Sequence, residues 1–195
     1  MQVVIDGTEL RCDSASFRSL NEVMDVAQLV IDPDRMIGAV QVDGRHLEEA
    51  DWRQSFALIR NACLQIQTVP RVSYVEERLA DAPKILNLVL ENLKVTADFF
   101  SRQELAEGHK RYASLMQDIQ EFISWYGNVL ALVPNRGEKL VQGLTVHIQN
   151  IKLVCDELLV QQLSRKWYEV SSILDGKLYS QVLELQKFAD DAARR

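Results

Sequence analysis

The spacing of apolar residues changes near Pro70, from alternation with polar residues to recurrence every three or four positions. Alternation is typical of strands that bury one face, and a three-four spacing is typical of helices with one apolar stripe. The sequence therefore predicts an α+β protein. Residues 1–70 should form a small mixed β-sheet domain with one main helix, and residues 71–195 an antiparallel bundle of about four helices.

Two hairpins are expected in the first domain, each centred on an Asp-Gly pair. The first lies within residues 3–12, around Asp6-Gly7, and the second within residues 40–47, around Asp43-Gly44. Asp-Gly is favoured at these places because both central residues of a tight hairpin turn have positive φ. The two pairs therefore predict four short strands.

A helix is expected between the hairpins, and a last strand after them. Ser19 and Glu22 form a capping-box pattern at the helix start, Asp32-Pro33 ends it, and residues 62–69 alternate as a strand. This order of elements over residues 1–69 resembles the β-grasp (ubiquitin-like) fold. The last strand runs into a helix and has no free Gly-Gly end. The resemblance therefore implies a scaffold or binding domain, and not a sulfur carrier or protein modifier.

The predicted bundle has recognisable helix boundaries. Capping-box patterns at Ser73-x-x-Glu76 and Ser101-x-x-Glu104 predict that helices begin there, and residues 134–137 (Pro-Asn-Arg-Gly) predict a break. Pro83 lies inside the first helical pattern and should kink or restart that helix, because proline has no backbone N–H to donate. Short connections favour antiparallel packing within one chain. A coiled-coil homodimer is the alternative use of the same apolar stripes.

The end of the bundle allows two interpretations. Residues 139–190 form either two helices or one long bent helix, because the joint at Leu163-Ser164 contains neither Gly nor Pro. Gly176 is expected to be a weak point of the last helix, since glycine costs about 1 kcal/mol in a helix interior.

The charge of the chain argues against two classes of partner. The formal net charge is −6, and residues 1–70 hold 11 Asp and Glu against 6 Arg. Nucleic acids need a basic surface, and anionic membranes attract one, so neither partner is expected. The sequence shows no signal-peptide pattern and no run of eighteen apolar residues, so neither a signal peptide nor a membrane-spanning helix is expected. Three widely separated cysteines (Cys12, Cys63 and Cys155) fit a reducing, cytoplasmic location.

The search for catalytic chemistry gives a negative prediction. A di-iron bundle needs Glu three residues before an inward-facing His, but Ala106 precedes His109 and Leu144 precedes His147 at that spacing. Phosphate-binding loops, nucleophile elbows and metal-spaced Cys/His sets are not found in the sequence either. We therefore expect no catalytic residues, no cofactor and no metal.

Adjacent aromatic residues provide the candidate partner-binding site. Tyr126 and Trp167 follow the apolar stripes, so their neighbours Trp125 and Tyr168 are candidates for exposed or groove-lining positions. Phe99-Phe100 has the same ambiguity at a helix end. The alternative is that all of these aromatics belong to a broad core. Tryptophan and tyrosine are common interface anchors, so the hypothesis is that Trp125, Tyr168, Phe99 and Phe100 line a groove for a peptide or helix.

Three functions follow from these observations. The first is a non-enzymatic interaction module, adaptor or chaperone-like, that binds an amphipathic helix of another protein. In architecture it is similar to the small helical chaperones of bacterial motility and secretion systems. The second is a structural homodimer assembled through the helices. The third is an enzyme or small-ligand binder at the junction of the two domains, where Arg71, Tyr74 and Arg78 lie in the sequence.

Overall fold

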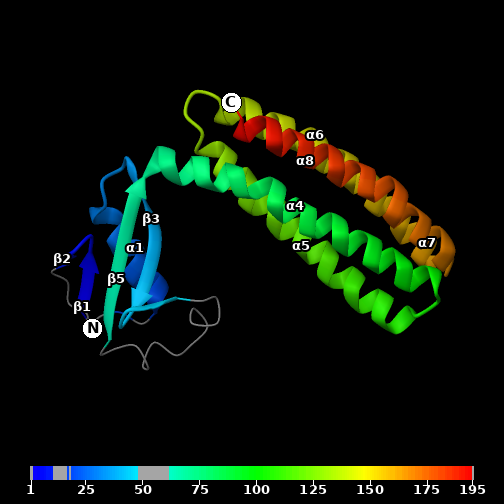
Figure 1. Ribbon diagram of the computed structural model, residues 1–195, viewed down its shortest axis with the longest axis horizontal. Coiled ribbons are helices and arrows are strands. Elements are labelled where there is room, and N and C mark those ends of the chain that lie inside the picture. Colours follow the sequence, from blue (N-terminus) through cyan, green and yellow to red (C-terminus); the bar gives the residue numbers. More distant parts are fainter. Residues whose placement is uncertain (1, 11–16, 18, 48–61, 195) are drawn as a thin grey trace. The chain divides into compact units, whose positions relative to one another are not determined.

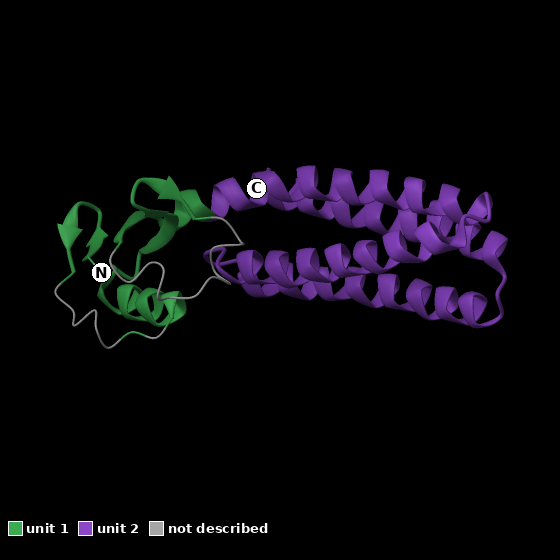
Figure 2. Ribbon diagram, turned by 90° about the horizontal axis from the view of Figure 1, so that it is seen from below, with its two compact units in different colours: residues 1–74 green, residues 75–195 purple. Residues whose placement is uncertain are grey.

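A computed structural model of the chain describes residues 2–10, 17, 19–47 and 62–194. It has an N-terminal mixed β-sheet with one helix, followed by a helical region (Figure 1). The contacts divide the chain into two compact units, residues 1–74 and residues 75–195 (Figure 2). The predicted α+β class is therefore confirmed. Cys12, which we expected to be a reduced thiol, lies outside the described residues.

The sheet of the first unit has five strands in the order β2-β1-β5-β3-β4. β1 and β5 are parallel neighbours at its centre, and the other neighbouring strands are antiparallel. The strands are β1 (Gln2–Ile5), β2 (Thr8–Glu9), β3 (Arg35–Val42), β4 (Arg45–His46) and β5 (Cys63–Pro70).

Both predicted hairpins are confirmed, and so is the helix between them. Asp6-Gly7 and Asp43-Gly44 all have positive φ, between 48° and 81°, as tight hairpin turns require. Helix α1 (Leu20–Val30) begins where the capping-box pattern placed it, because the Ser19 hydroxyl accepts a hydrogen bond from the Glu22 backbone N–H at 3.2 Å. Local polar signals therefore set the boundaries of these elements.

One polar network joins strands β3 and β5 to the turn between β1 and β2. The buried Thr68 in β5 donates its backbone N–H to Asp6 Oδ1 at 2.8 Å, and its hydroxyl also bonds to the Asp6 carboxylate. Arg35 of β3 donates to the Thr68 hydroxyl at 2.6 Å and to its carbonyl at 2.8 Å. The hydrogen bonds from Thr68 lower the pKa of Asp6, because they stabilise its ionised form.

This network predicts an acid-sensitive first unit. A carboxylate whose folded-state pKa is depressed stabilises the fold above its unfolded pKa, and this stability is lost as the pH falls through the folded pKa. We therefore expect the β5 amides of the wild type to lose protection from hydrogen exchange as the pH falls below the ordinary aspartate value of 3.8. Thr68→Val should reduce this dependence and cost about 1–2 kcal/mol. Thr68→Ser, which keeps the hydroxyl, should behave like the wild type, and a Thr68→Val profile identical to the wild type would contradict the account.

The helical unit consists of long helices that run side by side (Figure 2). They are α4 (Arg71–Ser101), α5 (Leu105–Ala131), α6 (Gly137–Leu163), α7 (Trp167–Ile173) and α8 (Tyr179–Ala193), with a π-helical turn η1 (Leu174–Leu178) between the last two. The apolar stripe of α5 is buried at Leu115, Ile119, Phe122 and Tyr126. Burial of such stripes is the main source of stability in a bundle of this kind.

Two capping-box predictions are wrong. α4 begins at Arg71, directly after β5, so Ser73 lies inside its first turn. Ser101 ends α4, and its hydroxyl donates to the Asp98 carbonyl at 2.8 Å instead of capping a new helix. The chain turns at Gln103, whose φ is +62°, and α5 starts at Leu105 without a side-chain cap.

The remaining predictions for the bundle have mixed outcomes. α4 continues through Pro83, so the proline does not restart the helix. The break near residues 134–137 is confirmed, with Asn135 at a φ of +61°. Residues 139–190 do not form one long bent helix. Arg165, with a φ of +54°, turns the chain between α6 and the second helical segment, in which α7, η1 and α8 follow one another directly. The weak point expected at Gly176 coincides with the π-helical turn.

Polar contacts between helices accompany the apolar core of this unit. Ser171 of α7 donates to the Ala97 carbonyl of α4 at 2.7 Å. Gln186 of α8 donates to the Pro83 carbonyl at 3.1 Å and to Asn87 at 2.6 Å. Because the Pro83 carbonyl has this partner, the part of α4 around the proline is held against α8.

Candidate functional site

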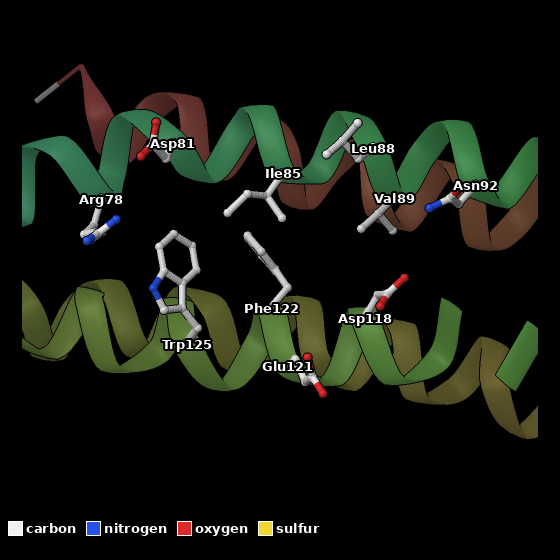
Figure 3. Close-up of a pocket in the computed structure, with 10 residues that line it drawn as sticks. All are labelled: Arg78, Asp81, Ile85, Leu88, Val89, Asn92, Asp118, Glu121, Phe122 and Trp125. Atoms are coloured by element: carbon white, nitrogen blue, oxygen red, sulfur yellow. The ribbon is translucent and has the colours of Figure 1, made fainter. Parts of the chain in front are cut away.

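A groove of about 490 Å³ lies between α4 and α5. Its α4 wall carries Ile85, Leu88 and Val89 in the middle, with Arg78 and Asp81 toward one end and Asn92 toward the other (Figure 3). Leu88 is 61% exposed, although it is a large apolar side chain. Ile85 and Leu88 therefore form apolar surface that the rest of the unit leaves open to solvent, whereas Val89 is buried beside them.

The opposite wall of the groove comes from α5 and carries two aromatic rings. Phe122 and Trp125 point from α5 toward α4 (Figure 3). Phe122 is buried, whereas Trp125 is half-buried, and their ring centroids are 5.8 Å apart. Residues three apart share a helix face, so the two rings form one continuous aromatic surface on the α5 wall. We call this site, with the residues named for its two walls, the α4/α5 groove.

The charges at the edge of the α4/α5 groove are unevenly distributed. Asp81 forms an ion pair with Lys84 at 2.7 Å, and Arg78 lies close enough to help lower the pKa of Asp81, after the hydrogen bond from Lys84. Asp118 and Glu121 on α5 form no ion pair with any of the described residues; Glu121 accepts a hydrogen bond from the Gln117 amide. Arg111, the basic residue of α5 nearest to Asp118 in sequence, is paired with Glu107 at 3.0 Å. The α5 edge of the groove is therefore acidic.

A smaller hollow of about 140 Å³ continues the α4/α5 groove toward the other end of α4. The two hollows share Asn92 and Asp118, and the second also contains Arg111. The Arg111 guanidinium lies over the ring of Phe99, 5.0 Å from its centroid. Open surface therefore extends along α4 from the Trp125 region to the Phe99 region.

The four aromatic candidates lie in four different environments. Trp125 lines the α4/α5 groove, and half-buried Phe99 lies beside the arginine of the second hollow. Tyr168 is 76% exposed on α7 and lines neither hollow. Phe100 is fully buried and stacks on Trp167 at a centroid distance of 5.9 Å. The proposed surface role of Phe100 is therefore incorrect, because this ring is part of the core.

Sequence reasoning missed a second apolar stripe on α4. Ile85, Leu88 and Val95 are all exposed, and with Asn92 and Phe99 they follow a spacing of three, four, three and four residues. The adjacent buried stripe, from Leu79 to Phe100, has the same periodicity and conceals the exposed one. The sequence did contain a signal for this exposed surface, because α4 carries two apolar stripes where one would suffice to pack it against the bundle.

Burial shifts the pKa of four ionisable groups in the helical unit. Burial raises the pKa of the Cys155 thiol and of the Tyr112 and Tyr126 phenols, and it lowers the pKa of the His147 imidazole. None of these four groups lines the α4/α5 groove. Within the described ranges, no three His, Cys, Asp or Glu side chains gather in a way that could hold a metal ion.

The helices in the described part of the chain are all too short or too polar to cross a membrane. Comparison of the whole chain with models of protein families, with curated proteins and with solved structures finds no match.

Proposed function

We propose that the protein is a non-enzymatic interaction module, adaptor or chaperone-like, whose helical unit binds a helix or peptide of another protein in the α4/α5 groove. The observation that carries this proposal is the open groove of about 490 Å³ with Trp125 on its α5 wall. Grooves between helices are a recurrent binding mode for amphipathic segments, because the partner buries its apolar face where the bundle is open.

Trp125 is the expected anchor of this interaction. It is half-buried beside Phe122, so the ring is held in place before the partner arrives and loses little conformational freedom on binding. Exposed apolar side chains on the facing wall, above all Leu88, provide the surface against which a partner side chain would pack. Aromatic anchors at the centre of an interface commonly contribute 2 kcal/mol or more, about a thirtyfold change in Kd.

Site-specific cross-linking tests the proposal. A photoreactive side chain in place of Leu88 should cross-link a partner from a lysate of the source cells, whereas the same group in place of Leu153 on α6 should not. Trp125→Ala should reduce the Leu88 cross-link by at least about tenfold, because the anchor is lost. Leu153→Ala is the matched control. Retention of both fold and cross-linking in Trp125→Ala would contradict the proposal.

The sheet unit supports a scaffold or second binding role in the same module. Its strand order, with β1 and β5 parallel at the centre and α1 packed on the sheet, agrees with the β-grasp resemblance. We include in this proposal a scaffold role for the sheet unit and a cytoplasmic location for the protein. The proposed chaperone-like role also follows the similarity in architecture to the helical chaperones of bacterial motility and secretion systems. The idea of a small-ligand site at the domain junction stays a prediction.

A structural homodimer is the second candidate function, and the outer face of α6 favours it. Val146, Leu153 and Val160 are more than half exposed and lie seven residues apart, and Leu163 extends the same surface. A seven-residue apolar repeat is the pattern that pairs helices in coiled coils. A mass in solution that doubles with concentration, and returns to that of the monomer in Leu153→Asp, would support this function over the first.

A further inference from the structure

We propose that the occupant of the α4/α5 groove is an amphipathic helix of another protein with three features. Its apolar residues follow heptad spacing, one polar residue faces Asn92, and lysines or arginines lie along the edge that faces α5. This inference rests on the proposed function and identifies the chemistry of the partner.

The spacing of the exposed stripe on α4 indicates a helical occupant. Ile85, Leu88, Asn92, Val95 and Phe99 occupy alternating steps of three and four residues, which is the pattern that a neighbouring helix fills in a coiled coil. The stripe extends over about 21 Å at 1.5 Å per residue, so a partner helix of about two heptads covers it and one of about three heptads extends past both of its ends. An extended peptide presents side chains every second residue and would not match this spacing.

Asn92 gives the position of the polar residue in the partner. It lies in the middle of the stripe, between Leu88 and Val95, and lines both hollows. A polar side chain in an otherwise apolar seam fixes the register of paired helices, because its amide needs a hydrogen-bonding partner when it is buried. The partner is therefore expected to place Asn, Gln, Ser or Thr opposite Asn92.

The acidic α5 edge gives the charge of the partner. Asp118 lines both hollows and Glu121 lines the larger one, whereas the carboxylate on the α4 side, Asp81, already has Lys84. An incoming helix with lysine or arginine along this edge would neutralise Asp118 and Glu121, and an acidic edge would be repelled. Because these carboxylates are exposed, their effect should weaken as salt is added.

Two synthetic peptides of about 21 residues provide the probe. Both have Leu at heptad positions with one central Asn, and they differ only in carrying Lys or Glu along one edge. Fluorescence anisotropy of each labelled peptide with the full-length protein measures Kd. At low salt we expect the Lys peptide to bind about three- to tenfold more tightly than the Glu peptide. This ratio should fall toward one when the salt concentration is raised tenfold.

Variants separate this inference from the proposed function. Asp118→Asn with Glu121→Gln should bring the ratio of the two Kd values close to one. The matched pair Asp156→Asn with Glu169→Gln, which changes the net charge equally on α6 and α7, should leave the ratio unchanged. Leu88→Ala should weaken both peptides at least about fivefold.

Three outcomes overturn the inference. In the first, the two Kd values of the wild type are equal, and Leu88→Ala weakens the binding of both peptides. This result rejects the basic edge of the partner but leaves the proposed function standing. A ratio that changes equally in the matched control pair assigns the effect to net charge and not to the groove. Failure of both peptides to bind rejects a helical occupant, and the proposed function then depends on the cross-linking result at Leu88.

Discussion

Phe100→Ala is expected to lower the free energy of unfolding of the helical unit by about 3–5 kcal/mol, the usual cost of removing a buried phenylalanine ring. Phe100 is fully buried and stacks on Trp167 at 5.9 Å. The rings of His109 and Tyr112 form T-shaped pairs with the same ring, at centroid distances of 5.3 and 6.4 Å. Alanine would leave a cavity where helices α4, α5 and α7 meet. Denaturation followed by circular dichroism measures the loss.

Phe99→Ala is the matched control for this prediction. The ring of Phe99 is half-buried and lies under the Arg111 guanidinium at 5.0 Å, so its loss removes one cation–π contact and little core packing. We expect the change in unfolding free energy to be about 1 kcal/mol or less. If Phe100→Ala were no more destabilising than Phe99→Ala, the assignment of Phe100 to the core would be contradicted.

Gly137→Ala is expected to destabilise the helical unit by about 2–3 kcal/mol, within the range for overpacked sites. A Cβ at Gly137 would lie 2.8 Å from the Leu130 carbonyl oxygen and 2.9 Å from that of Ala131. Both atoms belong to the last turns of α5 and cannot move without disturbing that helix. The Gly137 backbone N–H also donates to the Val133 carbonyl at 3.0 Å, which ties the start of α6 to the connection that follows α5. Thermal and chemical denaturation would both report the loss.

Gly176→Ala is the control with the opposite expected sign. A Cβ at Gly176 meets no atom within 4 Å, and the residue lies in the π-helical turn between α7 and α8. Alanine should stabilise the unit by about 0.5–1 kcal/mol, because glycine loses more backbone entropy on folding. Equal effects of the two substitutions would show that the close approach at Gly137 does not limit stability.

Much of the fold follows from local signals in the sequence. The Asp-Gly pairs predict both hairpins because only a few residue types accept positive φ, and the structure has positive φ at all four positions. The change of apolar spacing near Pro70 predicts the transition from sheet to helices. These predictions are confirmed because each depends on neighbouring residues alone.

The incorrect helix starts have a physical cause. Ser73 and Ser101 have the same spacing to a glutamate as Ser19, but only the Ser19 hydroxyl caps a helix. A capping box stabilises a helix start only where the preceding residue is free to leave the helix. α4 instead begins two residues before Ser73, and its last residue is Ser101. The geometry of the preceding element, which the local pattern does not contain, decides the outcome.

The candidate site could be predicted only in part. The sequence identified Trp125 as a groove-lining residue, because its neighbour Tyr126 follows the buried stripe. It could not separate Phe99 from Phe100, since neighbours at a helix end differ only in the direction of their side chains. The exposed stripe that includes Leu88 was hidden for another reason: in a helix with two apolar stripes, only the packing of its neighbours decides which stripe is buried.

Methyl NMR during titration with the lysine-edged peptide is the measurement that tests the helix-binding groove most directly. The account predicts chemical-shift changes at the methyl groups of Ile85, Leu88 and Val89, which line the α4/α5 groove. It predicts none at Leu153 and Val160, which are exposed on α6. Shift changes confined to α6, or their absence from α4 while the peptide binds, would contradict it.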